Sequence, residues 1–333
     1  MTHTDIIKDL KNKVYHPIYF LTGEEPYYID LICNFIEKNV LDEAEKEFNQ
    51  QVIYGKDTDM ATILASAKRY PMMANHNVVI VKEAQHLAKQ MEELEPYLDQ
   101  PTKSTILVFC YKYKPLDGRK AVTKKLKKQA VFFESKGIYE DKIPVWIEAY
   151  LKAKNYTIDA KATHLITESL GTNLGKIANE LDKLIISLPE GTSINASIVE
   201  ENIGINKDFN MFELNKAIGS KDIIKANRII NHFAKNEKEY PMPFVIAMLY
   251  SYFTNILKLH YLKDKSQRAV AAALKVNPFF VNDYYTAAKN YDIRKSVKII
   301  EYIREYDLKS KGVNNVSASW GELQKELIFK ILH

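Results

Sequence analysis

The stretch IYFLTGEEPYYIDLICNF, Ile18 to Phe35, decides the fold of the first part of the chain. It combines an apolar strand, a glycine turn and an amphipathic helix, the frame on which phosphate-binding proteins build a nucleotide loop. Such a loop follows G-x-x-x-x-G-K-[ST], in which glycines let backbone N–H groups approach the phosphates and the lysine supplies charge. Here Gly23 is followed by Glu24, Glu25 and Pro26. The carboxylates would repel phosphate and proline has no N–H group, so the frame is present without its phosphate chemistry.

A second feature of nucleotide sites also departs from the expected pattern. A P-loop ATPase needs an acidic residue after a second apolar strand, where it holds Mg²⁺. That strand should be Val78 to Val81, and it is followed by Lys82. We interpret this region as a degenerate nucleotide site that is not expected to bind nucleotide. Its predicted members are Gly23, Glu24, Glu25 and Lys82.

The composition indicates a globular protein of two or three domains, with 333 residues, 46% hydrophobic and 27% charged. A net charge of +5 permits a polyanionic partner without arguing strongly for one. Cys33 and Cys110 both lie in apolar runs and are interpreted as inert core thiols. No metal-binding spacing is present, and no metal or cofactor is expected. The apolar run Met242 to Phe253 looks too short for a bilayer span, and the N-terminus has no apolar signal core, so an intracellular protein is expected.

Strands and helices alternate in the first part of the chain, which predicts a parallel five-stranded sheet covered on both faces. The region after Ile143 is predicted to be helical, first as a small domain with a helix closed by Gly171 and then, from about Asp208, as a larger one. The predicted strands are Ile18–Leu21, Phe48–Tyr54, Val78–Val81, Ile106–Tyr111 and Val131–Glu134, and the predicted helices between them are Tyr27–Leu41, Met60–Tyr70, Ala88–Leu98 and Arg119–Lys128.

Two adjacent methionines lie between a helix and a buried strand, in the segment KRYPMMANHNVVIVKEAQ, residues 68–85. Pro71 breaks the helix, and Met72 and Met73 follow on a connecting loop. One explanation is that the loop tucks one or both side chains into the core, and the periodicity alone favours it. The other is that they form an exposed apolar plug that inserts into a partner's pocket, a use for which methionine is well suited.

The segment RKAVTKKLKK, residues 119–128, carries six cations in ten residues and is the main candidate for contact with a phosphate backbone. The alternative is a solvated surface helix whose Ala121, Val122 and Leu126 face the sheet. The possible DNA-facing residues are Arg119, Lys120, Lys124 and Lys125. The sequence contains neither G-x-S-x-G nor H-E-x-x-H, so no catalytic residue is proposed.

The order and spacing of several segments resemble the delta subunit of the bacterial DNA polymerase III clamp loader. The matching segments are IYFLTGEEPYYID, YPMMANHNVVIVKEA, the lysine-rich helix after LDGR, IPVWIEAYLKAKNYTI, FNMFELNKAI, NRIINHFAKNE, LKVNPFFVNDYYTAAKNY and LKSKG. The resemblance implies an α/β plus all-α chain with three parts. These are a degenerate AAA+-like domain over residues 1–140 with a non-functional nucleotide site, a small helical lid-like domain over 141–207, and a helical collar over 208–333.

The resemblance also implies a role in chromosomal DNA replication, as a cytoplasmic subunit of a DNA-directed DNA polymerase holoenzyme, a nucleotidyltransferase complex. In the family, an apolar pair on this loop inserts into a pocket of the sliding clamp (beta) and helps to open its ring. That pair falls on Met72 and Met73, after Pro71, where the family often carries leucine and phenylalanine. The collar would join gamma/tau and delta-prime type subunits around primer-template DNA. No ATP hydrolysis by this chain itself is expected, and no membrane partner.

Two other functions remain open from the residues themselves. One is an active P-loop-like NTPase with a non-standard nucleotide loop, which would bind nucleotide despite Glu24, Glu25 and Lys82. The other is a stand-alone DNA-binding module that uses residues 119–128, which would bind DNA with a steep dependence on salt.

Overall fold

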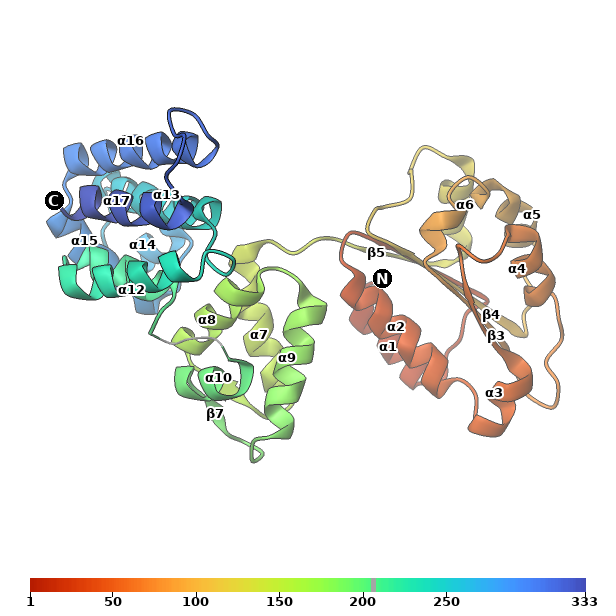
Figure 1. The fold of residues 1–333 in the computed structure, drawn as a ribbon. Helices are drawn as coiled ribbons and strands as arrows, with labels where there is room; N and C mark the ends of the chain where they lie inside the picture. Colours follow the sequence, from red (N-terminus) through yellow and green to blue (C-terminus); the bar gives the residue numbers. More distant parts are fainter. Residues whose placement is uncertain (205–207) are drawn as a thin grey trace. The chain divides into compact units, whose positions relative to one another are not determined.

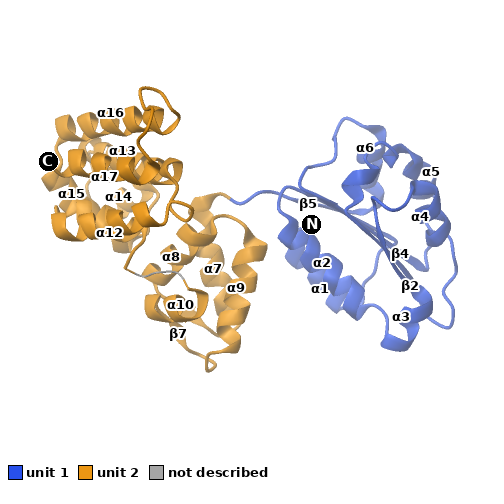
Figure 2. Cartoon of the chain, viewed as in Figure 1, with its two compact units in different colours: residues 1–138 blue, residues 139–333 orange. Residues whose placement is uncertain are grey.

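The computed structural model describes residues 1–204 and 208–333. The chain splits into two compact units, Met1–Ile138 and Tyr139–His333 (Figure 2). The predicted division into residues 1–140, 141–207 and 208–333 stays a prediction, and its second boundary lies at residues 205–207, outside the described residues.

The first unit is built on a parallel five-stranded sheet in the order β2-β3-β4-β1-β5. Its central strands are near-continuous runs of buried residues, as expected for parallel strands that are covered on both faces. The strands are β1 (Ile18–Gly23), β2 (Gln50–Tyr54), β3 (Asn77–Lys82), β4 (Thr105–Lys112) and β5 (Val131–Ser135).

Helices cover the two faces of this sheet, as Figure 1 shows for α1 and α2 against α4, α5 and α6. Because side chains alternate along a strand, Ile18 and Phe20 belong to one core and Tyr19 and Leu21 to the other. The helices are α1 (His3–Lys11), α2 (Pro26–Asn39), α3 (Glu43–Asn49), α4 (Met60–Ala67), α5 (Glu95–Asp99) and α6 (Ala121–Gln129), with short 3₁₀ turns η1 (Ala84–Leu87) and η2 (Met91–Leu94).

Some predicted elements of this unit are wrong in detail. The segment Ala88–Leu98 is not one helix, because it contains η2 and the separate helix α5, whose second residue is Pro96. Proline is tolerated in the first turn of a helix but not in its interior. Phe48 lies in α3 rather than in a strand, and α1 and α3 were not predicted.

The second unit begins with a small group of helices. Gly171 ends α8 with φ 66°, as the sequence predicted for a glycine stop. The expectation that strands cease after Ile143 is wrong, since β6 pairs in parallel with β7, each two residues long. The elements are η3 (Glu140–Lys142), α7 (Ile143–Lys152), β6 (Thr157–Ile158), α8 (Ala160–Leu170), α9 (Leu174–Ile186), β7 (Ser193–Ile194) and α10 (Ala196–Ile203).

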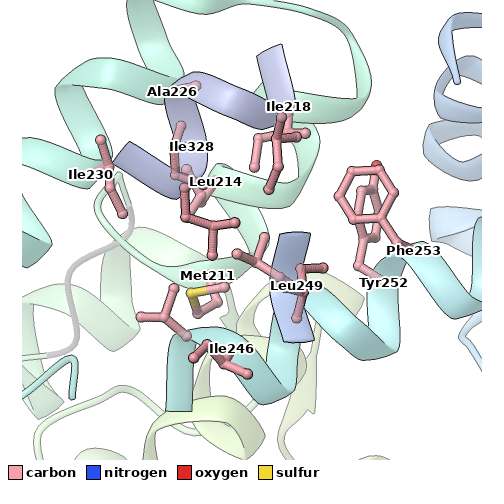
Figure 3. Packing of buried hydrophobic residues seen from close by; sticks show 14 of the residues in the cluster. Met211, Leu214, Ile218, Ala226, Ile230, Ile246, Leu249, Tyr252, Phe253 and Ile328 are labelled. Atoms are coloured by element: carbon pink, nitrogen blue, oxygen red, sulfur yellow. The ribbon is translucent and has the colours of Figure 1, made fainter. Parts of the chain in front are cut away.

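The rest of the second unit is helical around one large apolar core (Figure 3). Met211 and Leu214 of α11 meet Ile246 and Leu249 of α13 in this core. The elements are α11 (Met211–Gly219), α12 (Ile223–Lys235), α13 (Met242–Tyr261), α14 (Gln267–Leu274), η4 (Pro278–Phe280), α15 (Val281–Asn290), α16 (Ile293–Ser310) and α17 (Trp320–Leu332). The predicted fold class, a parallel five-stranded α/β part followed by helices, is confirmed.

Helix α13 corrects the expectation that its apolar run is too short for a bilayer. The helix continues to Tyr261, so that it is long and apolar enough, by length and composition, to cross a membrane. Half of its apolar 18-residue stretch is buried inside the protein, however, and Val245, Leu249 and Phe253 pack in the core of the second unit. These contacts are those of a core helix, which accounts for its apolar character.

Candidate functional site

The carboxyl end of β1 and the start of α2 form a corner that we call the closed corner, made of Gly23, Glu24, Glu25 and Ser135. The Ser135 carbonyl oxygen accepts hydrogen bonds from the backbone N–H groups of Glu24, at 2.9 Å, and Glu25, at 3.3 Å. Gly23 has φ 131°, and a Cβ atom on it would lie 2.0 Å from the same oxygen. The two backbone donors that follow the glycine are therefore engaged by the protein itself.

Glu25 occupies the N-terminus of α2, where a phosphate would otherwise be stabilised. Its side chain is 7% exposed and accepts a hydrogen bond from the backbone N–H of Tyr27 at 2.8 Å. Burial raises the pKa of the Glu25 carboxyl above its usual range, although the hydrogen bond from Tyr27 acts in the opposite direction. The N-terminus of α2 is therefore capped by Glu25, and it lacks one backbone N–H donor because its first residue is Pro26.

Two lysines at the same edge of the sheet are paired with acidic residues of α2. Lys82, at the end of β3, lies 2.8 Å from a carboxylate oxygen of Glu37, and Lys112, at the end of β4, lies 2.6 Å from Asp30. Burial lowers the pKa of Lys82, but the hydrogen bond and charge of Glu37 outweigh it, so the pKa is raised above its usual value. Both ammonium groups thus neutralise carboxylates of the protein.

The loop at residues 68–76, which we call the methionine loop, joins α4 to β3. The Met72 side chain is 57% exposed and the Met73 side chain is fully exposed, so the explanation that the core holds them is wrong. Met73 has φ 54°, a left-handed conformation that is uncommon for a residue with a side chain. Tyr70, two residues before Met72, is also exposed. Phe48 is exposed as well, and it lines a recess of about 230 Å³ together with Met72.

Three of the four candidate DNA-facing cations, two just before α6 and one on it, pair with nearby acidic groups. Arg119 pairs with Asp117 at 2.9 Å, Lys120 with Glu92 at 3.0 Å and Lys125 with Asp99 at 2.6 Å. Lys124 is exposed, whereas Val122 and Leu126 are buried as predicted, with Thr123 and not Ala121 as the third buried residue. Arg119, Lys120 and Lys125 would have to leave their carboxylates before they could contact DNA phosphates.

Sequence reasoning missed two residues that shape these sites. Ser135 acts through its backbone carbonyl, and no side-chain pattern reports such a contact. Asn49, which contacts the methionine loop, was placed in a predicted strand although it ends α3. The signal that could have located α3 is its capping box, in which Asp42 and Glu45 satisfy each other's backbone N–H groups.

The fold and these sites define a class of protein: an α/β module with the strand–turn–helix frame of a nucleotide-binding protein, a corner closed by its own groups, and a helical region beyond it. Comparison with known proteins agrees with this description. A family model described as DNA polymerase III, delta subunit, matches residues 19–136, and a model of the C-terminal domain of the same subunit matches residues 208–328.

DNA polymerase III subunit delta of Bacillus subtilis (strain 168) is 27% identical to this chain over 338 residues, which cover 98% of the chain and 94% of the relative. A solved structure of the Bacillus subtilis DNA clamp loader delta protein matches with a TM-score of 0.54 and 25% identity, and covers 99% of each chain. The chain belongs to the DNA polymerase III delta subunit family, and is a subunit of the clamp loader in the polymerase complex.

Proposed function

We propose that this chain binds the sliding clamp through Met72 and Met73, with Pro71 directly before them, and helps to open the clamp ring. The observation that carries the proposal is the exposure of both adjacent methionine side chains on a connecting loop. Burial of each side chain in a pocket of the clamp would contribute roughly 1.5–3 kcal/mol to the binding free energy, before the cost of the conformational freedom lost on binding is subtracted.

Opening requires that the methionine loop bind a distorted clamp better than a closed one, since only a difference in affinity can shift a conformational equilibrium. ATP would be bound and hydrolysed by other subunits, whose arrangement decides when the loop is accessible. Primed DNA would then trigger hydrolysis and release of the loaded clamp. In this proposal the chain acts in the cytoplasm and performs no catalysis of its own.

The closed corner supports a non-catalytic role. The Ser135 carbonyl engages two backbone N–H groups, and Lys82 is paired with Glu37. A nucleotide phosphate would have to displace these contacts and meet the Glu25 carboxylate at the helix N-terminus. An NTPase activity with a non-standard loop is therefore not favoured, and titration with ATP and Mg²⁺ should give no binding signal.

The partners proposed from the family are the other loader subunits, of gamma/tau and delta-prime type, which would assemble on residues 208–333. Exposed apolar side chains of that region support an interface, among them Ile224 at 85% and Phe329 at 60% exposure. Contact with primer-template DNA is proposed within the assembled complex. A stand-alone DNA-binding function is not favoured, because three of the four candidate cations on and before α6 already pair with carboxylates.

The experiment that tests clamp binding compares the purified chain with the Met72→Ala/Met73→Ala variant, using the sliding clamp of the same organism. A matched control is Ile223→Ala/Ile224→Ala, which truncates another adjacent pair of exposed apolar residues, in the second unit. Melting temperatures should be unchanged in both variants. Clamp binding should be lost only in the methionine variant, and equal binding by all three proteins would contradict the proposed contact.

A further inference from the structure

The buried side chain of Asn49 holds the backbone of Met72 at both of its polar groups. Asn49 is the last residue of α3 and is 2% exposed. Its Oδ1 accepts a hydrogen bond from the N–H of Met72 at 2.6 Å, and its Nδ2 donates to the carbonyl oxygen of Met72 at 2.9 Å. The same Nδ2 donates to the carbonyl oxygen of Glu45 at 3.0 Å, which ties the side chain to α3.

A second buried asparagine holds the start of the methionine loop. Asn77, the first residue of β3, donates from Nδ2 to the carbonyl oxygens of Ser66, at 3.0 Å, and Arg69, at 3.4 Å. Its own backbone N–H donates to the carbonyl oxygen of Ser104 at 2.8 Å. The start of the loop is thus attached to the sheet, while the side chain of Asn49 fixes both polar backbone groups of Met72.

Met73, the residue that follows Met72, has an unusual backbone conformation. Met73 has φ 54° and a fully exposed side chain, so burial of that side chain does not compensate for the left-handed backbone. A non-glycine residue persists in this conformation only when its surroundings fix the chain on either side. The hydrogen bonds of Asn49 to Met72 supply this restraint one residue before the strained position.

We propose that Asn49 is a positioning residue for the clamp contact, which holds Met72 so that the methionine side chains are presented before the clamp arrives. The inference rests on the proposed function, since it assigns a role in the same contact. A loop that is already in its bound conformation loses less freedom on binding. If only a fraction of the molecules present the loop correctly, the apparent dissociation constant rises by the inverse of that fraction.

The chemistry of the position requires a carboxamide. Asparagine supplies an acceptor for the Met72 N–H group and a donor for its carbonyl oxygen within one short side chain. Aspartate keeps the acceptor but loses the donor, and its charge would face the carbonyl oxygens of Met72 and Glu45. Alanine loses both hydrogen bonds to Met72 and the one to Glu45. The two substitutions should therefore loosen the loop by different routes.

The test uses Asn49→Ala and Asn49→Asp in the full-length chain, with Asn39→Ala as the matched control. Asn39 donates to the carbonyl oxygen of Phe35, four residues earlier, just as Asn49 does to that of Glu45, but it has no bond to the methionine loop among the described residues. Two quantities are measured: hydrogen exchange of the Met72 amide in the free chain, and the dissociation constant for the sliding clamp. If Asn49→Ala leaves one molecule in ten with a correctly placed loop, the dissociation constant should rise about tenfold.

The expected result is weaker clamp binding in both Asn49 variants and faster exchange at Met72 in Asn49→Ala, which removes the acceptor for that amide, with neither change in Asn39→Ala. The loss of affinity should be smaller when Asn49→Ala is combined with Met73→Ala, since the two act on one contact. An equal loss in both backgrounds would overturn the inference, because Asn49 would then act elsewhere. If Asn49→Ala does not fold, Asn49→Asp carries the affinity comparisons, alone and combined with Met73→Ala.

The failure of this inference and that of the proposed function give different results. Fast exchange at Met72 together with wild-type clamp affinity in Asn49→Ala would overturn the positioning role alone. Unchanged exchange at Met72 in folded Asn49→Ala would also overturn it. A wild-type chain that does not bind the clamp, or binding that survives Met72→Ala/Met73→Ala, would overturn the proposed function and this role with it.

Discussion

Replacement of Glu168 by glutamine should make the second unit more stable above neutral pH. Glu168, on α8, is 5% exposed at its side chain and accepts a hydrogen bond from the backbone N–H of Met211 at 2.6 Å. Burial raises its pKa to about 7, while hydrogen bonds from Met211 and Phe212 act in the opposite direction and the charge of Glu140 raises it further. A glutamine can keep the acceptor for Met211 and does not ionise.

The neighbouring histidine does not form an ion pair with this carboxyl at intermediate pH. The Nε2 atom of His164 lies 3.7 Å from Glu168, but burial lowers the pKa of His164 to about 4. Between the two pKa values the imidazole is neutral and the carboxyl is protonated. His164 destabilises the folded state as pH falls from 6.5 towards about 4, and it does so in the wild type and in the variant alike.

The magnitude follows from the shift of the carboxyl. A folded pKa above the unfolded one gives a stabilising contribution that is complete below pH 4.5 and is lost as pH rises to about 7. The difference of about 2.5 units corresponds to about 3 kcal/mol, at 1.36 kcal/mol per unit. The free energy of unfolding of Glu168→Gln should therefore match that of the wild type near pH 4.5 and exceed it by up to about 3 kcal/mol above pH 7.

The assay is urea unfolding at several pH values between about 4.5 and 8, followed by tryptophan fluorescence. The chain has two tryptophans, Trp146 and Trp320, and both lie in the second unit, so the signal reports the unit that contains Glu168. Glu201→Gln, at an exposed position on α10, is the control and should show no such dependence. The reasoning is refuted if the difference between Glu168→Gln and the wild type does not change with pH, or if it favours the wild type at high pH.

Two further predictions concern the first unit. Gly23→Ala should lower the free energy of unfolding by about 4 kcal/mol or more, because the new Cβ atom would lie 2.0 Å from the Ser135 carbonyl oxygen at a left-handed φ. Thermal melting checks this prediction. The control is Gly118→Ala, which should melt like the wild type because nothing lies within 4 Å of the new Cβ atom. Met73→Gly should raise stability or leave it unchanged, within about 1 kcal/mol, since relief of the left-handed backbone is offset by the freedom of glycine in the unfolded chain. It should nevertheless lose clamp binding, and a large drop in melting temperature would contradict this interpretation of φ 54°.

The parts of the fold that the sequence predicted are those in which burial leaves a local pattern. All five strands of the sheet overlap predicted runs. For β1, β3 and β4 the reason is that a parallel strand covered on both faces must be apolar at nearly every position, whereas the edge strands β2 and β5 are only partly buried. Short elements lack such a pattern. The strands β6 and β7 have two residues each, too few for any periodicity, and α3 is a polar helix with only Asn49 buried.

The candidate sites divide in the same way. The role of Gly23 and the acidic residues after it could be interpreted from their chemistry. A carboxylate repels phosphate, and a proline offers no N–H donor to it, whatever the fold. The engagement of Ser135 is a backbone contact between residues far apart in the sequence, so side-chain patterns carry no trace of it. The exposure of Met72 and Met73 could not be decided from periodicity, since a loop has none, and it depends on where Asn49 and Asn77 hold the chain.

Strand β3 connects the two sites, since it begins beside the methionine loop at Asn77 and ends at Lys82. At one end Asn77 holds the carbonyl groups of the segment that leads into the loop, and at the other Lys82 is paired with Glu37. In a nucleotide-binding protein the carboxyl end of this strand would contact the bound Mg²⁺ and phosphates. Here Lys82 is already paired with Glu37 within the chain, so we expect the position of the strand not to depend on a nucleotide in this unit. It follows that, if clamp binding is regulated by ATP as proposed, the control must come from subunits that cover or uncover the methionine loop.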